Sequence, residues 1–193
     1  MGIKPCTDAS AAGWISTSDV PWDQLVGFGP AGFASHARLR FIPDPTHEGQ
    51  AESEFGAGPG AVSETEQLAT AVDALLHHTS TPDELFFAFW DGFGFAMPAA
   101  HFEVPNRGFF LYRGSVSDNG SWDIPVADRA PGQQWMPVPA FIWPADHAWC
   151  IARDVDPHWA GIGAGPDALV ELLREETVDV VPANTAEPQP TYY

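Results

Sequence analysis

Basic residues are scarce in this chain. Eight Lys and Arg stand against 26 Asp and Glu in 193 residues, so the formal net charge is −18. A surface of this sign repels phosphate backbones and anionic lipids. We therefore expect no unassisted binding to nucleic acid or to a membrane surface.

Cysteine and long apolar runs are also sparse. The two cysteines, Cys6 and Cys150, cannot build a disulfide framework or a four-thiolate zinc site, so a reducing compartment is expected. The opening residues lack the apolar core of a secretion signal, and no apolar stretch reaches the 18 residues of a membrane span. These absences predict a cytoplasmic protein.

The acidic residues are concentrated in one part of the chain. Between residues 41 and 106 there are eleven Asp and Glu and no Lys or Arg. A field of this kind attracts and orients a basic partner. The predicted partner-binding surface comprises six of these acids: Asp44, Glu48, Glu52, Glu54, Glu64 and Glu66. A general bias toward acidity that serves only solubility is the alternative interpretation.

The order of apolar patterns predicts an α+β fold. Residues 36–41 alternate between polar and apolar, and residues 85–90 are apolar on both faces, as in a strand covered on both sides. Ser63 and Glu66 have the spacing of a capping box, which predicts a helix from Glu64 to His78. Strands that follow one another with few crossover helices favour a mainly antiparallel sheet flanked by a few helices.

Glycine and proline residues predict irregular segments between these strands and helices. With 18 Gly and 19 Pro, the chain is expected to carry long irregular insertions at about 44–62 and 117–139, the second held to the body by Trp122 and Trp135. The glycines of residues 161–165 are expected to form a turn before a helix. Residues 1–182 are predicted to form one domain, and residues 183–193 a flexible, solvated tail.

Residues 143–159, WPADHAWCIARDVDPHW, contain the densest collection of reactive side chains. In a regular strand over 147–156, Cys150 would face one side with small residues, while His147, Trp149 and Ile151 would face the other. Cys150 is therefore expected to be a small buried hydrophobe, and a Cys–His dyad with His147 is excluded.

The end of the same stretch offers the only catalytic alternative. Asp154, Asp156 and His158 could hold a divalent ion or act in general acid–base chemistry. His101 and Glu103 share one face of a predicted strand and could complete a metal site with Asp154 and Asp156. In the competing interpretation, Asp154 pairs with an arginine such as Arg113 or Arg38, Asp156 belongs to a turn, and His101 joins a cross-strand polar pair.

Three stretches carry a resemblance to known proteins: VPWDQLVGFGPAGFASHARLRFIPDP, FFAFWDGFG and FIWPADHAWCIARDVDPHWAGIGA. Together they resemble a family of uncharacterised proteins from high-GC Gram-positive (actinobacterial) genomes, over nearly the whole chain. That resemblance implies a shared fold, but it does not indicate an activity. The acidic α+β plan, the aromatic strand ending at Asp91-Gly92 and the late strand–glycine–helix unit also resemble the SUKH-type immunity superfamily, whose members bind and neutralise toxins. The long insertions depart from the SUKH pattern.

Two functional hypotheses follow. The first is a non-enzymatic interaction protein, of which an immunity protein is one form, that binds a basic protein through its acidic surface and exposed aromatic residues and needs no cofactor. The second is a small metal-dependent hydrolase-like enzyme, or a small-ligand binder, centred on Asp154, Asp156 and His158. Salt-sensitive association distinguishes the first, and stabilisation by a divalent ion distinguishes the second.

Overall fold

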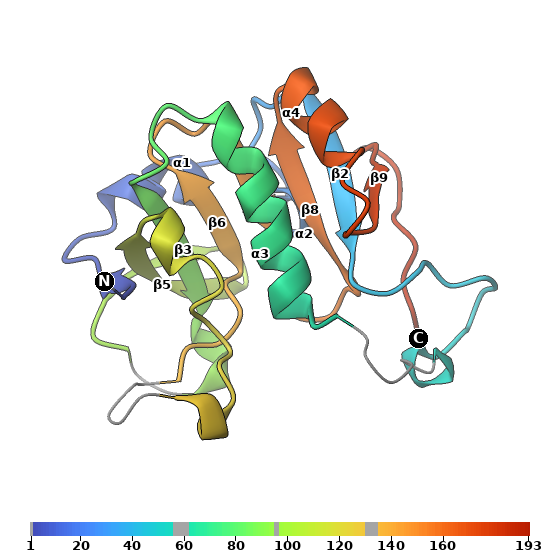
Figure 1. Cartoon of the computed structure of the whole chain (residues 1–193), viewed down its shortest axis with the longest axis horizontal. Helices are drawn as coiled ribbons and strands as arrows, with labels where there is room; N and C mark the ends of the chain where they lie inside the picture. The colour runs from blue at the N-terminus through green and yellow to red at the C-terminus, as the bar shows by residue number, and fades with distance from the viewer. Residues whose placement is uncertain (1, 56–61, 95–96, 130–134) are drawn as a thin grey trace.

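The computed structural model describes residues 2–55, 62–94, 97–129 and 135–193 (Figure 1). Within these ranges nine strands form one sheet in which every neighbouring pair is antiparallel. The strands lie in the order β1-β5-β3-β6-β7-β8-β2-β9, and β4 pairs with β5. Their bounds are β1 Lys4–Pro5, β2 Ser35–Arg40, β3 Leu85–Trp90, β4 Ala100–Val104, β5 Arg107–Gly114, β6 Phe141–Pro144, β7 Trp149–Ala152, β8 Trp159–Ala164 and β9 Val180–Pro182. The predicted α+β fold with a mainly antiparallel sheet is confirmed.

Helices cover both faces of this sheet. In the view of Figure 1, α3 and α4 lie in front of the sheet and α2 lies behind it. The helices are α1 Gly13–Ser16, α2 Trp22–Phe28, α3 Glu64–Leu75 and α4 Pro166–Leu172, and 3-10 turns occur at Ser10–Ala12, Glu52–Glu54, Leu76–His78, Asp91–Phe93, Val116–Asp118 and Val126–Asp128. None of the helices described is long and apolar enough to cross a membrane.

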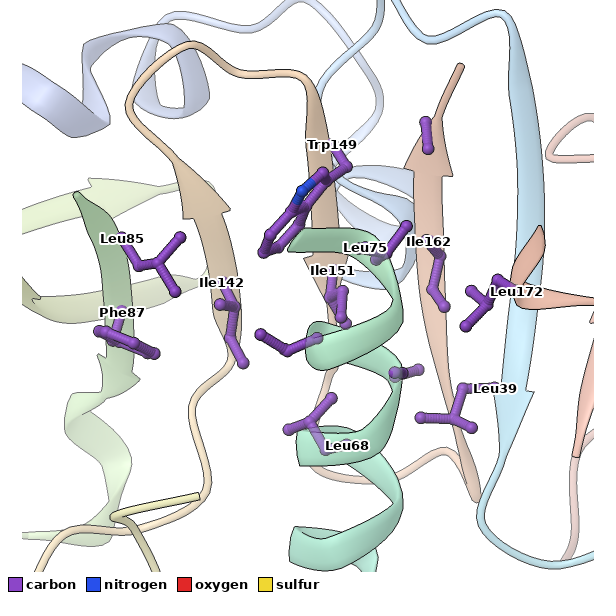
Figure 2. Packing of buried hydrophobic residues seen from close by; sticks show 14 of the residues in the cluster. Leu39, Leu68, Leu75, Leu85, Phe87, Ile142, Trp149, Ile151, Ile162 and Leu172 are labelled. Carbon is purple, nitrogen blue, oxygen red and sulfur yellow. The ribbon is translucent and has the colours of Figure 1, made fainter. Parts of the chain in front are cut away.

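The alternation of side chains along the strands builds two cores. Leu85, Phe87 and Phe89 of β3 pack under α3, whereas Phe86 and Ala88 belong to the core beneath α1 and α2. Figure 2 shows the first core, where side chains of β2, β3, β6, β7 and β8 meet Leu68 and Leu75 of α3. Because both faces of β3 are covered, its predicted position as a central strand is confirmed.

Helix α3 begins where its sequence predicts. The Ser63 hydroxyl accepts a hydrogen bond from the Glu66 amide at 3.2 Å, and the Glu66 carboxylate accepts one from the Ser63 amide at 2.9 Å. This reciprocal capping box satisfies two helix-end amides. The α-helix runs to Leu75 and continues as a 3-10 turn to His78, so the predicted range is confirmed.

The glycines at 161–165 do not form the predicted turn. Gly161 and Gly163 lie inside β8, a fully buried strand. A Cβ atom on Gly161 would come within 2.0 Å of the Gly27 carbonyl oxygen, and one on Gly163 would come within 2.3 Å of the Phe33 ring. These glycines are needed because the end of α2 and the segment after it lie directly on the strand.

The two insertions are irregular where they are described, apart from 3-10 turns, and residues 56–61 and 130–134 lie outside the described ranges. Trp122 is buried against the Phe87 ring, with the ring centroids 5.7 Å apart, so it holds the second insertion to the sheet as expected. Trp135 is half-buried and donates a hydrogen bond to Asp123.

The C-terminal tail, expected to be flexible and solvated, is mostly exposed and forms two hydrogen bonds with the body near its end. The Tyr192 hydroxyl donates to the Pro43 carbonyl at 2.7 Å, and the Tyr193 amide donates to the Gln50 carbonyl at 2.9 Å. In Figure 1 the C-terminus accordingly lies beside the 3-10 turn Glu52–Glu54. The tail therefore covers part of the first insertion.

Asp146 anchors the loop that leads into β3. Its carboxylate accepts hydrogen bonds from the Thr79 hydroxyl, the Ser80 amide and the Ser80 hydroxyl, at 2.7 to 2.8 Å. Burial opposes ionisation of this carboxyl, but the hydrogen bonds outweigh it and lower the pKa of Asp146 to about 2. The charged form of Asp146 therefore holds residues 79–80 in place.

Asp146→Asn is expected to weaken the fold at neutral pH and to flatten the pH dependence of stability between about pH 4 and 2. A carboxyl with a depressed folded pKa contributes stability above its unfolded pKa of about 3.9, and that contribution is lost as the pH falls toward the folded value. Urea unfolding across this pH range measures it. Asp128→Asn, which removes an exposed carboxylate with no hydrogen bond among the described residues, should leave the profile unchanged.

Candidate functional site

The carboxylates after β7 do not form the alternative catalytic group. Strand β7 ends at Ala152, so Asp154 and Asp156 leave the sheet rather than share its face. Asp154 accepts two hydrogen bonds from the Arg107 guanidinium, each 3.2 Å long, while Asp156 is exposed. Asp154 thus pairs with an arginine, as the competing interpretation required, but with Arg107 rather than Arg113 or Arg38.

His158 turns to a different partner. It is buried, and its Nε2 atom lies 3.1 Å from Oδ1 of Asp44, which also forms two hydrogen bonds with Arg38 at 2.7 and 3.0 Å and one with Arg40. Burial opposes ionisation of Asp44, but these hydrogen bonds hold the pKa of its carboxyl well below the usual range. Asp44 is therefore an internal anchor of the first insertion and not part of an open partner-binding surface.

His101 and Glu103 do lie on one exposed face of β4, as predicted. His101 contacts Asp91, with Nε2 and Oδ2 2.9 Å apart, rather than Asp154. Across the described ranges, no group of three or more His, Cys, Asp or Glu side chains could hold a metal ion. The structure does not bring the four residues of the alternative metal site together.

Cys150 occupies the environment predicted for it. It is fully buried in the core beneath α2, and burial raises the pKa of its thiol far above the usual value. His147 lies before β7 with a φ of 54° and stacks on Trp14, with the ring centroids 4.0 Å apart. The predicted face for His147 was wrong because the strand begins at Trp149, but the conclusion that Cys150 is a packing residue is supported.

The predicted acidic surface is divided by contacts within the chain. Besides Asp44, Glu64 pairs with Arg153 at 2.6 Å, Glu54 accepts from the Ala51 amide, and Glu66 caps α3. All of the set except Asp44 are exposed, and Glu48 and Glu52 are the two whose side chains form no hydrogen bond or ion pair among the described residues.

An exposed aromatic group around Arg107 forms a better candidate surface. The guanidinium carbon of Arg107 lies 5.6 Å from the ring centroids of both Trp22 and Trp90. Phe93 meets Trp90 edge-on at 5.4 Å, and Trp22 and Phe93 are 38% and 40% exposed. We call Trp22, Trp90, Phe93 and Arg107 the Trp–Arg cluster. The contacts of Arg107 with the two Trp rings and its ion pair with Asp154 hold the guanidinium in position.

Two acidic residues adjoin members of the Trp–Arg cluster in the chain. Asp23 and Asp91 directly follow Trp22 and Trp90. Arg107 is paired in register with Val104 of β4, so the exposed Glu103 side chain projects from the opposite face of the sheet. Asp154 already balances the charge of Arg107, and the chain as a whole carries a formal net charge of −18. Aromatic faces beside carboxylates are suited to binding lysine or arginine side chains.

Sequence reasoning missed this cluster because its members come from α2, β3, the turn after β3 and β5. The signal available was partial. Trp22 stands at a polar helix start, and Trp90 ends an apolar strand at a turn, so both were candidates for exposure. That Arg107 joins them depends on β5 pairing with β3, which brings Phe109 opposite Trp90.

Comparison of the chain with models of known protein families, with curated proteins and with solved structures finds no match.

Proposed function

We propose that the protein is a non-enzymatic interaction protein that binds a basic protein partner through the Trp–Arg cluster and the carboxylates around it. The observation that carries this proposal is the exposure of two aromatic side chains, Trp22, which packs against an arginine whose charge is already balanced, and Phe93, which packs against Trp90. Trp and Arg are the residues that most often dominate binding energy at protein interfaces, which supports the choice of this surface.

The use of basic residues inside the chain supports a basic partner. Arg38, Arg40, Arg107 and Arg153 each pair with a carboxylate, and their side chains are no more than 22% exposed. These pairs neutralise much of the positive charge of the chain. Most of the 26 Asp and Glu residues are not part of these pairs. A negative field of this kind accelerates and orients encounter with a positive surface.

An immunity-type role would be one form of this activity. The SUKH-type resemblance implies a toxin as the bound protein. Many toxins that act on nucleic acid are basic, because positive charge attracts the phosphate backbone that an acidic chain repels. Both cysteines are free thiols, which is in keeping with the proposed cytoplasmic setting.

Capture from a lysate of the encoding organism, with elution by increasing salt, tests the proposal. We expect the tagged full chain to retain one basic protein in stoichiometric amount and to release it as salt rises, because screening weakens the attraction between exposed charges. Trp22→Ala should weaken the association at least about tenfold, since truncating a central aromatic residue commonly costs about 2 kcal/mol of binding free energy or more.

Leu173→Ala is the matched control, because Leu173 is 39% exposed at the end of α4 and contributes nothing to the Trp–Arg cluster. Circular dichroism of each variant separates loss of binding from loss of fold. Equal retention by the Trp22→Ala chain and the original chain would contradict the proposed surface, and release insensitive to salt would contradict the proposed partner chemistry.

A further inference from the structure

A second concave site lies at the other end of β5. A cavity of about 570 Å³ is lined by residues of β1, by the end of β5 and the turn after it, and by the loop that leads into β3. Small-molecule sites in proteins occupy about 300 to 1,000 Å³. Arg107 begins β5, and the cavity residue Arg113 lies six positions later, which is about 20 Å along a strand. The cavity is thus separate from the Trp–Arg cluster.

One side of the cavity is cationic. Lys4 of β1 and Arg113 of β5 are directly paired in register, so their side chains project from the same face of the sheet. Like charges opposite each other destabilise a strand pair. Arg113 also differs from Arg38, Arg40, Arg107 and Arg153, because it forms no ion pair with a carboxylate of the described residues.

Another side of the cavity is anionic. Asp83 and Glu84, just before β3, are exposed and form no ion pair within the described ranges. Strand β5 lies between β1 and β3, so these carboxylates and Lys4 flank it from opposite sides. Asp118 also lines the cavity; it is only 3% exposed and accepts a hydrogen bond from the Ser115 amide.

The walls of the cavity are fixed by hydrogen bonds. Asp146 holds residues 79–80, the Glu84 amide donates to the Thr81 carbonyl, and the Val116 amide donates to the Pro82 carbonyl. The carboxylates of this loop are therefore presented by a constrained backbone. Pre-organisation of this kind lowers the entropic cost of ordering the site when a ligand binds.

We propose that this cavity binds a small zwitterion, with the carboxylate of the ligand between Lys4 and Arg113 and its ammonium group beside Asp83 and Glu84. An amino acid, or a short peptide with both termini charged, has this chemistry. The cavity volume, the paired cations on one flank and the carboxylates on the other are the features that specify it. The proposal does not depend on the basic protein partner, because it concerns a different end of the sheet and a different class of ligand.

Titration calorimetry on the full chain tests this with three probes of equal carbon-chain length: 6-aminohexanoate, hexanoate and hexylamine. We expect 6-aminohexanoate to bind at least tenfold more tightly than either single-charge probe. Arg113→Gln should weaken its binding at least tenfold. Arg174→Gln removes the same charge from an exposed position just after α4 and should leave the affinity unchanged.

A double variant, Asp83→Asn with Glu84→Gln, checks the other half of the site. It should weaken 6-aminohexanoate and hexylamine while leaving hexanoate unaffected. Equal affinity for 6-aminohexanoate and hexanoate would overturn the zwitterion proposal in favour of a simple anion site. Absence of measurable binding by all three probes, or an Arg113→Gln variant that folds and binds normally, would overturn it altogether.

Discussion

Gly161→Ala is expected to lower the free energy of unfolding by about 3 kcal/mol or more. The added methyl carbon would lie 2.0 Å from the Gly27 carbonyl oxygen and 2.6 Å from the Phe28 ring. Because the nearest obstacle is backbone, α2 must move away from β8 and open the core beneath it, and overpacking of a core typically costs about 1 to 3 kcal/mol and sometimes more. Chemical denaturation measures the loss.

Gly13→Ala provides the control for this substitution. Gly13 begins α1, and a Cβ atom there would meet nothing within 4 Å. We expect a change within about 0.5 kcal/mol, as for most surface substitutions. If Gly161→Ala unfolded at the same denaturant concentration as the original chain, the close approach of α2 to β8 would be refuted.

Asp44→Asn is expected to cost about 3 kcal/mol of stability. Arg38 is only 6% exposed and its charge is balanced by Asp44, which also joins Arg40 and His158. Breaking a buried ion pair leaves an uncompensated charge, which commonly costs about 3 to 5 kcal/mol, and the 21% exposure of the Asp44 side chain places the expected loss at the lower end.

The pH dependence of the same pair has a defined sign. Because the folded pKa of Asp44 is depressed, its contribution is present above the unfolded pKa of about 3.9 and is lost as the pH falls below it. Asp44→Asn should therefore remove part of the acid sensitivity of the fold. Glu48→Gln makes the same charge change at an exposed position nearby and should alter neither stability nor its pH profile. Identical stability of the two variants would show that Asp44 is not an anchor.

Local patterns predicted the core well because burial follows the period of each element. The two apolar faces of β3 and the capping box of α3 are properties of a few consecutive residues, and both are found as expected. The two glycines of β8 were assigned to a turn because glycine has no side chain to show a period. Their role appears only when α2 is placed on the strand.

Pairings between distant residues could not be predicted in the same way. Asp44 and His158 are 114 positions apart, and Arg107 and Asp154 are 47 apart. Which carboxylate meets which cation depends on the order of strands in the sheet. The local alternation of apolar and polar residues does not determine that order. The sequence therefore indicated that carboxylates would pair with arginines but not which arginine each would meet.

Hydrogen exchange of the chain, alone and bound to the basic protein that it captures, tests the proposed binding surface most directly. The account predicts slower exchange at residues 22–24, 91–94 and 104–107, which carry or adjoin the Trp–Arg cluster. Binding covers these backbone amides, whereas amides far from the contact should exchange as before. Protection confined to residues 46–54, where the exposed Glu48 and Glu52 lie, would contradict the account and return the interface to the first insertion.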